Sequence, residues 1–229
     1  QARNIGGPAN WNFVFERGRG VFFKWASAND VCHSSFVERC EEVLRDNSEV
    51  VLCYPRTRFI DADGESQGVY HDDIELTDPD LTRRFRKLIL KGRLNNAHQG
   101  LIRTSALRKT HLERNYENGD LPLMAELALL GKWVLLPELL FFRRMATDTH
   151  MVDVTPEQRR ELFYSETSTP YLPFLRHFLG YCGVVLRFPS SFSPKVDLCR
   201  TLARLLYWNG GRALEDLKHL LRWSFRIQE

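Results

Sequence analysis

The chain has 229 residues, of which 43% are hydrophobic, so it can bury a substantial core and is not a disordered protein. Lysine and arginine outnumber aspartate and glutamate by only 32 to 29, which argues against nucleic acid as a partner. No apolar run reaches the roughly 18 residues that span a bilayer. The five cysteines are odd in number and include no Cys-x-x-Cys pair, which predicts reduced thiols in a cytoplasmic protein.

The first segment, residues 1–7, has the glycine and asparagine content of a loop. Pro8 is well placed to begin a helix that runs to about Arg17. A glycine loop before a helix can receive an anion on free backbone N–H groups, although most Gly-Gly pairs are only turns. The chain starts at Gln1 in the middle of a motif, and we expect a preceding segment of a longer protein to be missing.

The stretch 21–30 carries the leading candidate for a functional residue. Its five bulky residues, 21–25, predict a buried strand, and three small residues then lead to Asn29 and Asp30 before a helix that opens near Ser34. In open α/β sheets ligands bind outside the carboxyl ends of strands, where a carboxylate can hold a cation that bridges a diphosphate. We therefore expect Asp30 to bind a metal. The dipeptide alone supports at least equally a turn that caps the next helix.

Alternating patterns predict a mixture of helices and strands in the middle of the chain. The expected elements are a helix at about 34–46, strands at 50–54 and 56–60, an amphipathic helix at 81–91, a strand at 99–103 and a helical turn at 105–109. Asp61, Asp63 and Gly64 predict a hairpin turn, since a calcium loop would need a third acid and a closing glutamate.

A second acidic residue, Asp120, precedes an apolar helix. Asn118 and Gly119 predict a turn, the helix at 121–130 follows, and Gly131 closes it. A carboxylate in this place is most often a helix N-cap. Two short strands, 133–137 and 139–144, are expected to complete the sheet.

From Pro156 onward the pattern is helical. Expected helices cover 157–166, 172–181, 196–208 and 214–225, separated by prolines and a Gly-Gly pair. We interpret this tail as a packing element, a partner surface or a peripheral contact with the inner face of the membrane, in that order. Basic clusters at 83–87 and 200–226 are usually solvated helix faces and only sometimes anion or membrane-surface sites.

Several short motifs in a fixed order resemble family 2 glycosyltransferases with the GT-A fold, over roughly residues 1–150. The matching residues are Arg3-Asn4-Ile5-Gly6-Gly7-Pro8-Ala9-Asn10, Phe22-Phe23-Lys24-Trp25-Ala26, Asn29-Asp30, Tyr54-Pro55, Ile60-Asp61 with Gly64, Gly100-Leu101-Ile102-Arg103, Asp120, Ala125-Glu126-Leu127-Ala128-Leu129, Pro137-Glu138 and Leu140-Phe141-Phe142-Arg143-Arg144. The resemblance implies a catalytic domain at 1–150 and a helical extension at 151–229. It also implies an α/β fold, with a mixed, Rossmann-like sheet flanked by helices.

The same resemblance implies an inverting transfer of a sugar from a nucleotide-diphosphate sugar to a glycan, lipid-linked or other hydroxyl acceptor, assisted by Mg²⁺ or Mn²⁺. Asp30 matches the metal-binding position, Asp120 matches the general base, and His150 matches a histidine that completes the metal and diphosphate site. The residues expected to contact the donor are Arg3, Asn4, Gly6, Asn10, Asn29 and Arg144.

Three features depart from that family pattern. Asn29 stands where an aspartate is common, and Asn118-Gly119 stand where another acid often precedes Asp120. Only 29 residues precede Asp30, whereas a βαβ unit takes roughly 30 or more, so we expect an N-terminally truncated fold in which the strand 21–25 lacks a neighbour. Two other functions stay open: a non-catalytic sugar-nucleotide or glycan binding module, which would explain Asn29, and a scaffold that works through the helical tail at 151–229.

Overall fold

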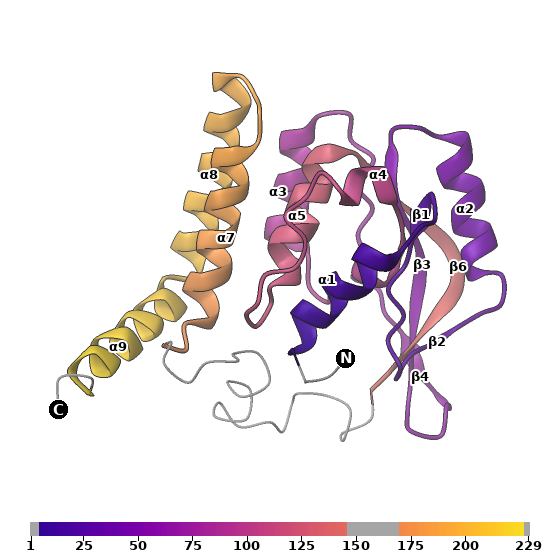
Figure 1. Cartoon of the computed structure of the whole chain (residues 1–229), viewed down its shortest axis with the longest axis horizontal. Coiled ribbons are helices and arrows are strands. Elements are labelled where there is room, and N and C mark those ends of the chain that lie inside the picture. Colours follow the sequence, from indigo (N-terminus) through magenta and orange to yellow (C-terminus); the bar gives the residue numbers. More distant parts are fainter. Residues whose placement is uncertain (1–4, 146–169, 227–229) are drawn as a thin grey trace.

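The structure is a computed structural model that describes residues 5–145 and 170–226 (Figure 1). These residues form a curled mixed sheet with helices on both faces. The strands are β1 (Phe22–Phe23), β2 (Val31–Cys32), β3 (Val50–Ile60), β4 (Ser66–Val69), β5 (Leu101–Arg103) and β6 (Lys132–Arg144). The helices are α1 (Gly7–Arg17), α2 (Phe36–Asp46), α3 (Leu81–Lys91), η1 (Asn96–Gln99), α4 (Thr104–Leu107), α5 (Asp120–Leu130), α7 (Pro173–Arg187), α8 (Phe192–Trp208) and α9 (Gly210–Arg226).

The sheet has the strand order β1-β5-β3-β6-β2, and β4 also pairs with β3. The central pair β3 and β6 is parallel, whereas the other pairs are antiparallel. Each of these two central strands is continuous where the sequence predicted two shorter ones. Their register shifts after Pro55, and Pro137 and Glu138 of β6 are skipped. Proline cannot donate a ladder hydrogen bond and is tolerated at such bulges, so a strand continues past it.

The prediction of a buried strand at 21–25 is wrong in its extent. Only β1 is a strand there, it lies at the edge of the sheet beside β5, and Val21 is 72% exposed. A short strand that was not predicted, β2, follows the irregular segment and pairs with the end of β6. Asp30 therefore lies directly before an edge strand, next to the last residues of β6, and not at the end of a buried strand.

Apolar side chains cover both faces of the sheet. Helix α2 packs Phe36, Cys40 and Leu44 on one face. Helix α5 packs on the other face through residues such as Leu123 and Leu127. Almost every side chain of α5 is buried because the helix lies between the sheet and a further layer of helices, which explains an apolar composition without a polar face (Figure 1).

The helical tail contributes that further layer. Helices α7 and α8 pack on α3 and α5 through one apolar cluster, which includes Phe85 and Ile89 from α3 and Leu198 and Leu202 from α8. The three predicted helices at 172–181, 196–208 and 214–225 are confirmed, and all three are longer than expected. The helix expected at 157–166 lies outside the described residues.

Candidate active site

A cleft of about 430 Å³ opens beside the end of β6. Five segments that are distant in the sequence supply its walls. The lining residues are Trp11, Ser27, Asn29, Asp30, Asn95, His98, Gln99, Asp120, Phe141, Arg143 and Arg144. The cleft thus brings together four residues singled out in the sequence: Asn29, Asp30, Asp120 and Arg144.

Asp30 is fixed by the strand beside it. Its Oδ1 accepts a hydrogen bond from the backbone N–H of Arg144 at 3.0 Å, and the side chain is half-buried. The Arg144 guanidinium donates to the carbonyls of Asn29, Asp61 and Ala62, at 3.0, 2.5 and 2.5 Å. Arg144 therefore ties the segment before β2 to the β3–β4 turn and holds Asp30 at the rim of the cleft.

Asp120 begins helix α5 and faces the same cleft. Its Oδ2 accepts a hydrogen bond from Asn95 Nδ2 at 2.5 Å. The N-cap position belongs to Gly119, and no hydrogen bond from the Asp120 side chain to the backbone of its own helix is found within the described residues. The carboxylate thus contacts Asn95, a residue of another segment that lines the cleft. It is half-buried, with solvent on one side.

A partly buried chain of polar side chains supports the adjacent wall. Arg143 Nη1 donates to Asn96 Oδ1 at 2.6 Å, and Asn96 Nδ2 donates to Asp73 Oδ1 at 3.1 Å. The other oxygen of Asp73 accepts from the backbone N–H of Thr57 at 3.0 Å. Burial raises the pKa of Asp73 above its ordinary value. These contacts hold the Arg143 guanidinium, a permanent positive charge, in the wall of the cleft.

The floor of the cleft is aromatic and rigid. The His98 ring stacks on Trp25 at a centroid distance of 4.5 Å and on Trp11 at 4.7 Å. Its Nε2 hydrogen-bonds to Glu113 Oε1 at 2.8 Å. Burial raises the pKa of Glu113, and the hydrogen bond from His98 partly opposes that shift. Because Trp25 Nε1 donates to the carbonyl of Trp11, helix α1 is anchored to this floor.

The remaining predicted residues lie elsewhere. Gly6 and Asn10 lie at the start of α1, where the Asn10 N–H donates to the Gly6 carbonyl at 3.0 Å, and the next residue, Trp11, lines the cleft. Arg3, Asn4 and His150 fall outside the described residues.

Seven cleft residues were not identified as site residues from the sequence: Trp11, Ser27, Asn95, His98, Gln99, Phe141 and Arg143. Three of them belong to the polar run at 95–99, between an amphipathic helix and a short strand. A polar segment that contains a histidine and directly precedes a strand is a usable sequence signal for a site. It does not show which of its residues face the cleft. Arg143 precedes Arg144 directly and would have been found by considering both arginines at the end of the predicted strand.

The cleft offers little to hold a metal ion by itself. The described residues contain no group of three or more histidine, cysteine, aspartate or glutamate side chains placed to hold a metal ion. Asp30 provides one carboxylate, and Mg²⁺ is commonly bound through one or two carboxylates together with substrate phosphates and waters. The residues present therefore fit a cation shared with a diphosphate and not a self-contained metal centre.

Compared with protein-family models and with curated proteins, the sequence matches none. Across residues 5–145 and 170–226, no helix combines the length and apolar character needed to cross a membrane. Any activity of the chain has to be inferred from the cleft and from the motifs that surround it.

Proposed function

We propose that the chain is an inverting glycosyltransferase of the GT-A type that uses a nucleotide-diphosphate sugar as donor and a hydroxyl as acceptor. The observation that carries this proposal is that Asp30 and Asp120 line a single cleft although they belong to distant segments. An inverting displacement needs a proton acceptor on one face of the sugar and stabilisation of the departing diphosphate on the other. Two carboxylates from separate elements, accompanied by arginines, meet both needs.

Asp120 is the proposed general base. As the acceptor oxygen forms a bond to the anomeric carbon, the bond from that carbon to the diphosphate oxygen breaks and its electron pair leaves with the diphosphate. The hydroxyl proton passes to the Asp120 carboxylate. The hydrogen bond from Asn95 orients this carboxylate, and its exposed side leaves room for the acceptor.

The positive charge that stabilises the departing diphosphate comes from the wall that carries Arg143. The Arg143 guanidinium lies in the cleft and can donate to phosphate oxygens. A divalent cation held between Asp30 and the diphosphate would neutralise further negative charge as the bond breaks. Arg144 has a positioning role: its guanidinium donates to three backbone carbonyls and thereby fixes the segment that carries Asp30. Trp11, which is half-buried, supplies an apolar surface at the floor on which a ring can stack.

One observation favours a second function, a sugar-nucleotide binding module without turnover. Asn29, which stands where the resembled family commonly has an acid, is exposed beside Asp30 and leaves this rim of the cleft with a single carboxylate. A weaker metal site would still bind a donor through Arg143 and the aromatic floor. Such a module would release no nucleoside diphosphate.

The test is to incubate the protein with a panel of nucleotide-diphosphate sugars, with Mn²⁺ or with a chelator, and to measure nucleoside diphosphate release. A glycosyltransferase releases product from at least one donor by slow hydrolysis, more quickly when a suitable hydroxyl acceptor is present, and more quickly with Mn²⁺. Saturable binding of a donor without any release would establish the binding module instead. If no member of the panel either binds or reacts, both functions are wrong.

A further inference from the structure

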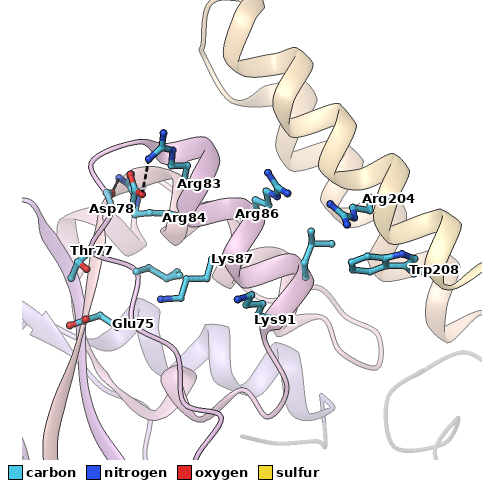
Figure 2. Close-up of a pocket in the computed structure, with 12 residues that line it drawn as sticks. Glu75, Thr77, Asp78, Arg83, Arg84, Arg86, Lys87, Lys91, Arg204 and Trp208 are labelled. Carbon is cyan, nitrogen blue, oxygen red and sulfur yellow. Dashed lines mark hydrogen bonds and ion pairs between the residues drawn. The ribbon is translucent and has the colours of Figure 1, made fainter.

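A second, larger hollow lies beside helix α3, between the preceding segment 75–78 and helix α8. Its volume is about 680 Å³, and Figure 2 shows its walls. The lining residues are Glu75, Leu76, Thr77, Asp78, Arg83, Arg84, Arg86, Lys87, Leu90, Lys91, Arg204 and Trp208. We call this hollow the α3–α8 groove.

Cations dominate the groove. Arg83, Arg86, Lys87 and Lys91 share the exposed face of α3, because their spacing of three and four residues matches the helical turn. Arg204 reaches the same space from α8, and Figure 2 shows it across from Arg86. An adjoining hollow of about 450 Å³ shares Arg83, Arg86, Leu90 and Arg204 with the groove and extends it along α3 and α8 toward Asp80 and Asp197.

Three aspartates lie at one end and are already paired. Asp78 and Asp80 contact Arg83 at 3.6 and 3.8 Å, and Asp197 contacts Arg200 at 2.9 Å. The cations along the middle of the groove are Arg86, Lys87, Lys91 and Arg204. Within the described part of the chain, none of these four side chains forms an ion pair. Glu75 is the one further carboxylate on its rim, so the middle of the groove carries a net positive charge.

The fold forces these like charges together. Phe85 and Ile89 of α3 pack with Leu198 and Leu202 of α8 in one buried cluster, which sets the two helices side by side. The buried Arg84 fixes α3 further, since it donates to backbone carbonyls that include those of Ala128 at 2.8 Å and Asp78 at 2.8 Å. Basic residues on a single helix face are usually only solvated. Here two rigid helices present them to the same hollow, and a bound polyanion would relieve their repulsion.

The groove also has an apolar wall. Trp208 is 54% exposed, and the Arg204 guanidinium lies over its ring at 4.6 Å from the centroid. Leu90 lines the same space from α3. Trp208 and Leu90 therefore place apolar surface beside the cations, against which the ring or hydrocarbon portion of a charged ligand can pack.

We propose that the α3–α8 groove is a binding site for a ligand that carries closely spaced phosphate groups attached to an apolar or ring-containing portion. Arg86, Lys87, Lys91 and Arg204 bind the phosphates, and Trp208 with Leu90 contacts the remainder. A soluble polyphosphorylated molecule and the headgroup of a polyphosphorylated lipid both have this chemistry. The site is separate from the Asp30–Asp120 cleft and does not depend on the activity proposed for that cleft.

The experiment uses two probes with the whole chain, in a chelator so that no metal contributes. Sodium tripolyphosphate is titrated by calorimetry, and phosphatidylcholine vesicles with or without phosphatidylinositol bisphosphate are tested by co-sedimentation. The groove variant is Arg86→Glu/Arg204→Glu. The matched control is Arg108→Glu/Lys109→Glu, which makes the same change of net charge at two exposed residues outside the groove. Arg86→Gln/Arg204→Gln is used as well, in case charge reversal impairs folding, and circular dichroism checks each variant.

Wild-type protein is expected to bind tripolyphosphate if the natural ligand is soluble, or only the phosphoinositide vesicles if it is a lipid headgroup. In either case the groove variants lose roughly tenfold or more in affinity, since each removes two charge-assisted hydrogen-bond donors, and the control variant keeps wild-type affinity. Wild-type binding weakens as salt is added. The proposal is overturned if neither probe binds, if the groove variants bind as wild type does, or if the control loses as much affinity as they do.

Discussion

Replacing Asp120 by asparagine separates its role as a base from its role at the start of a helix. The substitution keeps the size and shape of the side chain. An asparagine there can still present an oxygen to Asn95 Nδ2, which now donates to Asp120 Oδ2 at 2.5 Å, so the local geometry is retained. An amide cannot take up the proton of the acceptor. Asp120→Asn therefore changes the proposed chemistry and little else.

General base catalysis contributes roughly 10²–10⁴-fold to the rate, and each factor of ten corresponds to about 1.4 kcal/mol of barrier. Asp120 is only half-buried, so water reaches it and can partly replace it as proton acceptor. We therefore expect the lower part of that range, a loss of roughly 10²-fold in kcat, or about 2.7 kcal/mol. Loss of a negative charge in the first turn of α5 lowers the unfolding free energy by about 0.3–1 kcal/mol.

The assay is acceptor-dependent release of nucleoside diphosphate, measured over a range of donor concentrations. The donor KM should stay close to wild type while kcat falls. Asn95→Ala is the companion variant: it keeps the base but removes the group that orients it, so its loss of kcat should be smaller. Wild-type kcat in Asp120→Asn would refute the assignment, because the amide cannot accept the acceptor's proton.

Three further predictions concern stability. Because burial raises the pKa of Glu113, the folded state binds the Glu113 proton more tightly than the unfolded state does, and the stabilisation from this proton is lost as the pH rises from the unfolded pKa through the folded one. Urea unfolding across a pH series should therefore show the unfolding free energy of wild type falling relative to that of Glu113→Gln, and a difference between the two proteins that does not change with pH would contradict this. Leu198→Ala should lower the unfolding free energy by roughly 2–5 kcal/mol in chemical denaturation, since Leu198 is fully buried between α8 and α3, whereas a loss below about 0.5 kcal/mol would mean that the tail does not stabilise the domain. Gly131→Ala should cost roughly 1–3 kcal/mol in thermal or urea unfolding, because its Cβ would lie 2.3 Å from Val51 Cγ1, and an unchanged stability would show that this contact adjusts freely.

The sequence was most informative where a periodic pattern extended over several turns. The prediction of a helix at 81–91 matches α3 to the residue, and Asp80, whose side chain accepts from the Thr82 N–H at 2.8 Å, marks its start. The edge strands β1 and β2 have two residues each, too few to show an alternation. Trp25 was assigned to a strand because of its size, whereas the fold uses it to stack on His98.

The cleft was predictable only in part, for a related reason. Asp30 and Asp120 were identified from motifs that lie along the chain, and the structure places them in one cleft. Asn95 and Arg143 reach the same cleft through contacts between distant elements, since Asn95 meets Asp120 and Arg143 meets Asn96. No spacing within one segment encodes such contacts, so sequence patterns did not reveal them.

Metal-dependent donor binding tests the proposed role of the cleft most directly. Nucleotide-diphosphate sugars that bind the wild-type protein are titrated by calorimetry with Mn²⁺ and with chelator, into wild type and into Asp30→Ala. The matched control is Asp63→Ala, which removes an exposed carboxylate outside the cleft. We predict that Mn²⁺ strengthens donor binding to wild type and to the control, and that this gain disappears in Asp30→Ala while the protein stays folded. An equal gain from Mn²⁺ in Asp30→Ala would contradict the assignment of Asp30 to the metal and diphosphate.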